Sequence, residues 1–414
     1  MTQLRIHQQT IKNMDSIVRW YKDKTKNSFL PVYSSYDIRD SGYKVTNVDA
    51  NIFPAGFNNI CPTDKELSVD IMQKYLDLHY LPGLKNILLI TEEHTNNPHY
   101  WENVSAIIDI LEGCDLNVKV AFPRTVDDGM LMTSTTGKKI PVHSAAQDSA
   151  LFKTFIPDLV ISNNDFSNSY EEWAKNFSYT MNPPRELGWY QRQKSRYFKF
   201  YNHLVNEFSD VAQIDPFLMR VETEEFLKFD INDEASRSQL ASQVDQMLLK
   251  LGRDYSSRGI DQKPFVFVKN NHGTYGLAVI RVGSGQEVLD WTYKSRKKMK
   301  AAKGGNDVEE VIIQEGIPSV VKSGDASAEP VVYMIGCELA GGFLRTHAEK
   351  SETESLNSPG AVYKKMCVAD LQINAQGCPN ENVYGWSAKL GLLAIAAEAK
   401  EMGIEVKDYI QTSC

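Results

Sequence analysis

The sequence predicts a protein of two folded units, an α/β unit built on a parallel sheet followed by an α+β unit. The chain has 414 residues, more than one hydrophobic core usually organises. Its first half alternates short aliphatic runs with a helical pattern, and its second half places strand pairs around a glycine-containing loop before one long helix. We expect residues 1–195 to form the first unit and residues 196–414 the second.

The first unit is predicted from a β-α-β pattern. Residues 85–91 (KNILLIT) form an aliphatic run, the segment YWENVSAIIDILEG has helical periodicity, and residues 117–122 form a second run. Residues 157–162 (PDLVIS) predict a third strand that ends in a polar loop. The carboxyl ends of parallel strands commonly bind ligands. The substrate-binding candidates at these ends are Glu92, His94 and Asn164.

The second unit opens with a strand that suits phosphate binding. Residues 264–269 (PFVFVK) predict a buried strand, followed by the loop NNHGTYG and the return strand LAVIRV. A strand-end lysine can neutralise phosphate oxygens, and glycines let backbone N–H groups approach an anion. The loop lacks the GxxxxGK[ST] pattern, and an ordinary β-turn is the alternative. The candidates are Lys269, His272, Gly273, Thr274, Tyr275 and Gly276.

The next strand resembles the hinge at which ATP-grasp enzymes contact adenine and ribose. Residues 311–317 (VIIQEGI) are apolar until the strand ends in polar groups. An edge strand that turns at Gly316 is the alternative. The candidates for ATP binding here are Gln314, Glu315 and Ile317.

The segment EPVVYMIGCELAGGFLRTH predicts a hairpin, because Val331, Tyr333 and Ile335 alternate before Gly336. It resembles the ATP-grasp hairpin whose terminal arginine holds the transferred phosphate. A guanidinium can meet the developing negative charge with two hydrogen bonds. Arg345 is therefore the main catalytic candidate, together with Lys269, and a structural salt bridge is the alternative for Arg345.

Two segments are candidates for Mg²⁺, which ATP-grasp ligases usually hold through an Asp and a later Glu-x-Asn. As a strand, ADLQIN would place Asp370, Gln372 and Asn374 on one face, with Gln where Glu is expected. The segment ETESLNSPG offers Glu354 and Asn357, with one extra residue between them. Carboxylate and amide oxygens are suitable ligands in both segments, so the sequence leaves the choice open.

Several motifs in order resemble the proteobacterial-type glutamate-cysteine ligase family of the ATP-grasp superfamily over nearly the whole chain. They are YSSYDIRDSGYKVTNVDANIFPAGFNNICP, TEEHTNN, SNNDFS, MNPPRELGWYQRQKSRYF, VKNNHGTYG and LNSPG. The resemblance implies a pre-ATP-grasp-like domain followed by an ATP-grasp domain. It implies that ATP phosphorylates the γ-carboxylate of glutamate and that cysteine then gives γ-glutamylcysteine, the first step of glutathione biosynthesis. The alternatives are another ATP-grasp ligase, such as glutathione synthetase, and a non-catalytic nucleotide-binding protein.

The first of these motifs suits the capture of an amino acid. Arg39 can pair with an α-carboxylate, and Asp37, Asp40 or Asp49 can accept from an α-ammonium group. A turn-rich loop whose asparagines cap their own backbone is the alternative. The substrate-binding candidates are Arg39, Asp49, Asn51, Asn58 and Asn59.

Composition limits the partners and the location. The net charge of -8 and the pI near 5.6 argue against nucleic-acid binding. The sequence has neither a signal-peptide pattern nor an apolar run of membrane-spanning length, so we expect a cytoplasmic protein without a membrane partner. Six scattered cysteines without a CxxC pair predict reduced thiols. The expected partners are glutamate and cysteine, and homo-oligomerisation is left open.

Overall fold

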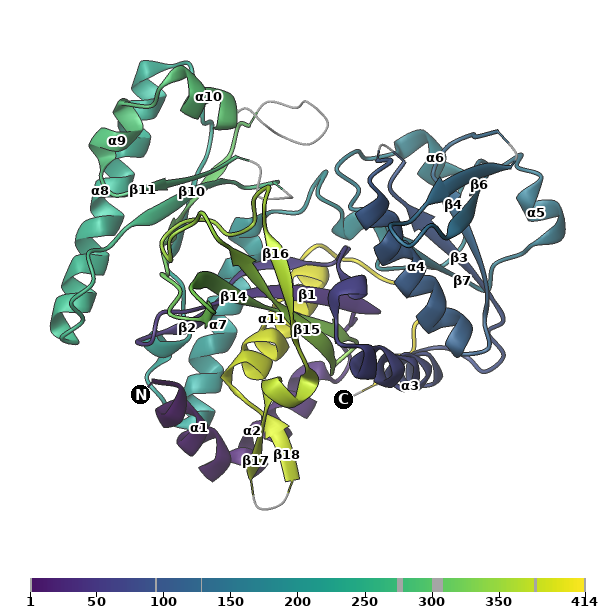
Figure 1. Ribbon diagram of the computed structural model, residues 1–414, viewed down its shortest axis with the longest axis horizontal. Coiled ribbons are helices and arrows are strands. Elements are labelled where there is room, and N and C mark those ends of the chain that lie inside the picture. The colour runs from purple at the N-terminus through teal and green to yellow at the C-terminus, as the bar shows by residue number, and fades with distance from the viewer. Residues whose placement is uncertain are drawn as a thin grey trace.

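The computed structural model describes residues 2–93, 95–127, 129–273, 278–299, 308–375 and 378–412. It contains a parallel sheet, a central antiparallel sheet and a smaller antiparallel sheet with its own helices (Figure 1). This mixed architecture confirms the predicted α/β and α+β class. None of the helices in these ranges is long and apolar enough to cross a membrane.

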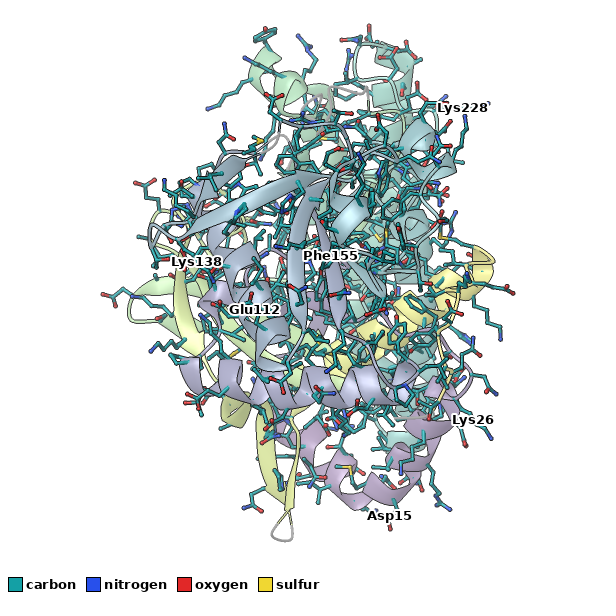
Figure 2. All side chains as sticks on the ribbon, turned by 90° about the vertical axis from the view of Figure 1, so that its right-hand side faces the viewer. Asp15, Lys26, Glu112, Lys138, Phe155 and Lys228 are labelled. Carbon is teal, nitrogen blue, oxygen red and sulfur yellow. The ribbon has the colours of Figure 1, made fainter. Side chains whose placement is uncertain are left out.

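The parallel sheet confirms the predicted β-α-β unit. Strand β3 (Asn86–Thr91) pairs in parallel with β4 (Asn117–Phe122) and with β7 (Leu159–Asn163), and α4 (Pro98–Gly113) connects β3 to β4. The sheet order is β5-β6-β4-β3-β7-β8, and only β5 runs antiparallel to its neighbour. The other strands are β5 (Met130–Thr133), β6 (Lys139–Ser144) and β8 (Met181–Asn182). Figure 2 looks onto this part of the molecule and labels Glu112 and Lys138 on it.

The central sheet joins strands from both ends of the chain. The hairpin of β14 (Ala326–Ile335) and β15 (Glu338–His347) is confirmed, but β14 also pairs with β1 (Tyr33–Asp40), which pairs with β2 (Val45–Asn51). Residues 33–51 are therefore paired strands rather than a turn-rich loop. Strand β16 (Val362–Met366) and β2 form the two edges of this sheet, and the short strand β13 (Lys322–Ser323) pairs with the start of β14. Because this sheet spans residue 195, the division into units at that residue stays a prediction.

Two helices cover opposite faces of the central sheet. Helix α11 (Val383–Glu401) packs on the face that carries Val332 and Met334, and α3 (Pro62–His79) packs on the face that carries Val331 and Tyr333. Gly391 allows the close approach of α11, because a Cβ atom there would overlap the Tyr36 ring. Helices α1 (Thr2–Lys12), α2 (Met14–Thr25) and α7 (Lys194–Ala212) add to the core around α11.

The third sheet has the order β11-β10-β12-β9 and carries the predicted phosphate-loop strand. Its strands are β9 (Thr223–Phe226), β10 (Val266–Asn270), β11 (Val279–Val282) and β12 (Val311–Glu315). Helices α8 (Glu234–Ser257), α9 (Gly285–Leu289) and α10 (Tyr293–Met299) lie beside it at the upper left of Figure 1.

The remaining elements are short. They are α5 (Leu151–Thr154), α6 (Glu171–Lys175), η1 (Phe57–Asn59), η2 (Arg185–Leu187), η3 (Pro216–Leu218), η5 (Val368–Leu371) and the hairpin of β17 (Gln372–Ala375) with β18 (Cys378–Glu381). Cys337 is disulfide-bonded, so the expectation that all the cysteines are reduced thiols was wrong. Cys61, Cys114 and Cys367 are free.

Candidate functional site

A cleft lies between the central sheet and the β9–β12 sheet. Its walls come from β1, β2 and β14 on one side, from β10, β11 and β12 on the other, and from a loop near residue 357. The lining residues are Asp37, Arg39, Val48, Asp49, Lys194, Phe267, Lys269, Asn270, Gly273, Val279, Gln314, Glu315, Ile317, Glu329, Ser355 and Asn357. The cleft thus combines an apolar wall with several charged groups.

A network of alternating charges borders the cleft: Asp37, Arg39 and Glu329 line it, whereas Arg345, which pairs with both carboxylates, does not. Arg345 Nη1 donates to Asp37 Oδ2 at 2.5 Å and to Glu329 Oε1 at 2.7 Å, and Arg39 Nε lies 2.5 Å from Glu329 Oε2. Glu329 and Arg345 are directly opposed on β14 and β15, and Asp37 is one strand away on β1. The register of three strands therefore brings two guanidinium groups and two carboxylates together with little exposure to water.

The two carboxylates of this network differ in their pKa shifts. Burial and the charge of Glu329 raise the pKa of Asp37, against the opposing effect of Arg345. Burial also acts to raise the pKa of Glu329, but Arg39 and Arg345 together lower it. Arg345 Nε is buried and has no hydrogen-bond partner among the described residues, so one donor of this guanidinium is unused.

Two lysines stand beside this network. Lys269 Nζ donates to Val48 O at 3.1 Å and to Gln314 Oε1 at 2.5 Å, and Lys194 forms an ion pair with Asp49. Burial lowers the pKa of Lys269 to about 8, although Asp49 opposes this shift. Burial would raise the pKa of Asp49, but Lys194 and Lys269 lower it. Arg39, Lys194 and Lys269 therefore present three cationic groups to one cleft.

The apolar part of the cleft is formed by Val48, Phe267, Val279 and Ile317. Ligand sites commonly pair such a wall with a few polar groups that fix the orientation of the ligand. The apolar wall and the three cations together suit a molecule with a flat ring at one end and negative charge at the other.

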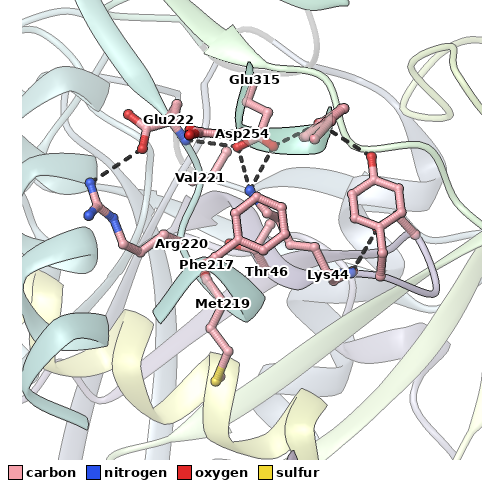
Figure 3. A network of polar contacts seen from close by, with 12 residues as sticks. Lys44, Thr46, Phe217, Met219, Arg220, Val221, Glu222, Asp254 and Glu315 are labelled. Atoms are coloured by element: carbon pink, nitrogen blue, oxygen red, sulfur yellow. Dashed lines mark hydrogen bonds and ion pairs between the residues drawn. The ribbon is translucent and has the colours of Figure 1, made fainter. Parts of the chain in front are cut away.

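The carboxylate of Glu315 is already bound within the protein (Figure 3). Its two oxygens accept from Lys44 Nζ at 2.6 and 2.7 Å, from Tyr255 OH at 2.8 Å and from the backbone N–H of Glu222 at 3.1 Å. Lys44 and Glu315 are both 1% exposed. These contacts leave only the backbone of Glu315 for the predicted ATP binding.

We expect Lys44→Met to lower the free energy of unfolding by roughly 3 to 5 kcal/mol, because it leaves Glu315 as a buried charge without its cation. Urea unfolding measures this loss. Lys138→Met is the matched control, because Lys138 pairs with Asp109 at the exposed surface and its loss should cost less than about 1 kcal/mol. Equal, small losses in both variants would show that the buried pair contributes little.

The cleft brings together seven of the residues predicted from sequence, namely Arg39, Asp49, Lys269, Gly273, Gln314, Ile317 and Asn357, besides Glu315. Thr274, Tyr275, Gly276 and His94 lie outside the described residues. His272 does not line the cleft, and its Nε2 lies 3.1 Å from Glu310 Oε2. The other predicted substrate residues that do not line the cleft are Asn51, Asn58, Asn59, Glu92 and Asn164.

Glu92 and Asn164 instead support loops of the parallel sheet. Glu92 Oε1 accepts from the backbone N–H of Asp165 at 3.1 Å, and Asn164 Nδ2 donates to Thr91 O at 3.1 Å. Asn51 lies in the β1–β2 ladder, and Asn58 and Asn59 lie in η1. These side chains therefore lie in the supporting structure around the cleft.

The two segments considered for Mg²⁺ lie in different places. Asp370 belongs to η5 and not to a strand, so the expectation that it shares a strand face with Asn374 was wrong. Asn374 is exposed on the β17–β18 hairpin at the bottom of Figure 1. Asn357 lines the cleft, and the backbone oxygen of Glu354 accepts from Arg39 Nη2 at 2.8 Å.

Glu329 and Lys194 are the charged lining residues that we did not predict as site residues. On β14 the alternation that joins Ile335, Tyr333 and Val331 continues back to Glu329, so the period of two places this carboxylate on the same face. Lys194 begins α7 and is buried against Asp49 and Trp189, whereas a basic segment usually predicts a solvated helix start. The strand alternation was a usable signal for Glu329, and the basic segment that contains Lys194 was a weak one, because it fits a phosphate contact as well as a solvated helix start.

Comparisons with known proteins give consistent results. A family profile described as glutamate-cysteine ligase matches residues 7–399. A structure from Methylobacillus flagellatus KT, assigned as a gamma-glutamylcysteine synthetase, is 32% identical, covers 96% of each chain and superposes with a TM-score of 0.85. A search of curated proteins found no match.

Two further solved structures superpose only weakly. A glutathione synthetase-like effector from Globodera pallida is 11% identical with a TM-score of 0.40, and the match covers 87% of each chain. A D-alanyl-alanine synthetase A from Vibrio cholerae O1 is 12% identical with a TM-score of 0.33, and covers 78% of this chain and 82% of its own. These two likenesses are too weak to carry an argument.

Proposed function

The chain belongs to the glutamate-cysteine ligase family and is an ATP-dependent glutamate-cysteine ligase, and from this premise we propose that the cleft between the central sheet and the β9–β12 sheet is its active site. The observation that carries the proposal is the meeting of three cations, an apolar wall and a buried guanidinium network in one cleft. Families of this kind use ATP, so the cleft has to hold a base, a triphosphate and an amino acid.

The roles follow from the chemistry of each wall. Phe267, Val279 and Ile317 would contact the adenine ring, and Lys269 and Lys194 would neutralise phosphate oxygens. Arg39 would pair with the α-carboxylate of glutamate, and Asp49 would accept from its ammonium group. These assignments extend the sequence prediction for Arg39, Asp49 and Lys269.

The reaction then proceeds in two displacements. An oxygen of the γ-carboxylate attacks the γ-phosphorus, and ADP leaves, giving γ-glutamyl phosphate. The amine of cysteine attacks the acyl carbon, phosphate leaves, and the nitrogen loses a proton to give γ-glutamylcysteine. Arg345 would stabilise the transferred phosphoryl group, because its Nε is a donor without a partner among the described residues. Because this enzyme belongs to glutathione biosynthesis, we propose that it works in the cytoplasm and acts on small molecules rather than on nucleic acid.

Charge in the cleft supports a need for Mg²⁺. Asp37, Asp49 and Glu329 face four cations, Arg39, Lys194, Lys269 and Arg345, which leaves one net positive charge on these groups. One charge is too little for a triphosphate together with a substrate carboxylate. Asn357 and the carboxylates of Glu329 and Asp37 are oxygen donors that fit Mg²⁺, whereas the carboxylate of Glu354 accepts from Lys350 and Ser351. Bound Mg²⁺ would neutralise phosphate charge there.

Mass detection of γ-glutamylcysteine from ATP, Mg²⁺, glutamate and cysteine tests the proposed function. ADP release with γ-glutamylcysteine and glycine in place of these substrates would indicate a glutathione synthetase instead. ATP binding without ADP release would indicate a non-catalytic protein.

We expect excess chelator to abolish ADP release, and Asn357→Ala to raise the Mg²⁺ concentration required for half-maximal rate by roughly tenfold or more. Asn374→Ala is the matched control, since Asn374 is an exposed asparagine on the β17–β18 hairpin and should leave the requirement unchanged. The reverse result, an effect of Asn374→Ala alone, would place the metal outside this cleft.

A further inference from the structure

Two copies of a short pattern, Cys-x-x-Asp, meet away from the cleft. The first is Cys61 to Asp64 (CPTD), and the second is Cys367 to Asp370 (CVAD). Cys61 precedes the first residue of α3, and Cys367 precedes the first residue of η5. The same pattern therefore begins two helical segments that lie about 300 residues apart in the sequence.

The structure brings the side chains of these patterns into one cluster. The Sγ atoms of Cys61 and Cys367 and a carboxylate oxygen of Asp64 all lie within 4.8 Å of one another. Asp370 lies close enough for its charge to act on both Asp64 and Cys367. Three groups that can bind a metal thus converge from two separate elements, with Asp370 near them.

Backbone hydrogen bonds hold the carboxylates in place. Asp64 Oδ2 accepts from the backbone N–H of Val368 at 2.9 Å, which connects α3 to η5. Asp370 Oδ2 accepts from the backbone N–H of Cys367 at 2.8 Å. Each bond occupies one oxygen of a carboxylate, and the second oxygen of each remains for another ligand.

No basic side chain compensates this cluster within the part of the chain that the structure describes. Asp64 is 5% exposed and Cys61 is 8% exposed, yet neither Asp64 nor Asp370 forms an ion pair with a lysine, arginine or histidine there. A buried carboxylate without a cation is unfavourable. A divalent cation would supply the missing positive charge.

We propose that Cys61, Asp64 and Cys367, with Asp370 as the fourth ligand, bind one thiophilic divalent cation such as Zn²⁺. Two sulfur and two oxygen donors suit four-coordinate Zn²⁺, whereas Mg²⁺ avoids thiolates. Binding converts both thiols to thiolates and releases two protons to solvent. The ion would join the start of α3 to η5, distinct from the Mg²⁺ proposed for the cleft.

The test uses the full chain, reduced with a phosphine and free of ATP, amino acids and Mg²⁺. Calorimetry with Zn²⁺ should show one ion per chain. The measured heat should depend on the buffer, because the buffer takes up the released protons. Alkylation by N-ethylmaleimide, followed by mass spectrometry of peptides, reports on each thiol separately. Zn²⁺ should slow alkylation of Cys61 and Cys367 at least about tenfold and leave that of Cys114 unchanged.

Variants assign the binding to the cluster. Cys61→Ser and Cys367→Ser should each weaken Zn²⁺ binding by about 100-fold or more. Even the loss of a residue that only hydrogen-bonds to a metal ligand lowers metal affinity by about 10- to 100-fold. Cys114→Ser is the matched control, because Cys114 is also a buried free cysteine but lies outside the cluster, and it should bind Zn²⁺ as the wild type does. Thermal unfolding without Zn²⁺ identifies any variant that fails to fold. If a cysteine variant does not fold, the Zn²⁺ affinity of Asp64→Asn, which keeps both thiols, shows whether the cluster binds the ion.

Three results would overturn the proposal. The first is a wild-type chain that takes up no Zn²⁺, and the second is unchanged affinity in folded Cys61→Ser or Asp64→Asn. The third is a Cys61–Cys367 disulfide that forms in air at the same rate with and without Zn²⁺, which would make the two cysteines a redox pair.

Discussion

Replacing Arg345 with lysine is expected to lower kcat by about 10²-fold or more, while ATP still binds. Arg345 reaches Asp37 through both terminal nitrogens and Glu329 through one, and its Nε is still without a partner among the described residues. A lysine presents a single ammonium group and cannot hold two carboxylates while also meeting a phosphoryl oxygen. The variant therefore loses transition-state stabilisation and leaves one carboxylate without its cation.

Steady-state kinetics and ATP calorimetry on the same preparation measure this effect, and circular dichroism shows whether the variant is folded. Arg124→Lys is the matched control, since Arg124 pairs with Glu93 outside the cleft and should leave kcat unchanged. A folded Arg345→Lys variant with near-normal kcat and a lower thermal midpoint would show that Arg345 only supports the fold. A raised KM for glutamate at unchanged kcat would show that it only binds substrate.

Replacing Lys269 with methionine is expected to weaken ATP binding by about 10- to 100-fold, the cost of one hydrogen bond to a charged group. Methionine keeps much of the length of the side chain, so packing against Phe267 should change little. Calorimetry with ATP measures the change. Lys199→Met is the control, because Lys199 is an exposed lysine that pairs with Glu401 away from the cleft. Unchanged ATP affinity in the folded variant would remove Lys269 from the phosphate site.

The same lysine predicts how ATP affinity depends on pH. Because burial lowers the pKa of Lys269 to about 8, the side chain is mostly cationic at pH 7 and loses its proton as the pH rises through 8. ATP affinity of the wild type should therefore fall between pH 7 and pH 9. The Lys269→Met variant lacks this group and should lose less affinity over that interval.

Local sequence signals were enough where a strand or loop is specified by its own residues. The aliphatic runs at β3, β4 and β7 predicted the parallel sheet, and PFVFVK predicted β10 with Lys269 near its end. The hairpin that carries Arg345 was also readable, because apolar residues alternate along β14.

The remainder of the site depends on pairings that no local pattern contains. Asp37 and Glu329 meet only because β1 pairs with β14, far away in the chain. Glu315 ends an apolar strand, as expected for a ligand-binding hinge, but Lys44 and Tyr255 bind its carboxylate from two other segments. Asp370 had the right spacing for a strand, yet its carboxylate caps η5 instead. For Asp37, Glu329 and Glu315 a distant partner decided where the side chain points, whereas Asp370 binds the backbone N–H of Cys367, three residues away.

The pairing of β1 with β14 also bears on how the chain is made. Strand β1 ends at Asp40, and its partner on this side of the sheet is complete only at Ile335. During synthesis the ribosome therefore releases about four fifths of the chain before the two strands can pair completely. Until then, the edge of β1 that pairs with β14 lacks its partner strand. Contacts between residues so far apart in the sequence also reduce the rate of folding. The proposed active-site cleft is thus among the last parts of a nascent molecule to form, and incomplete chains lack the charge network beside it.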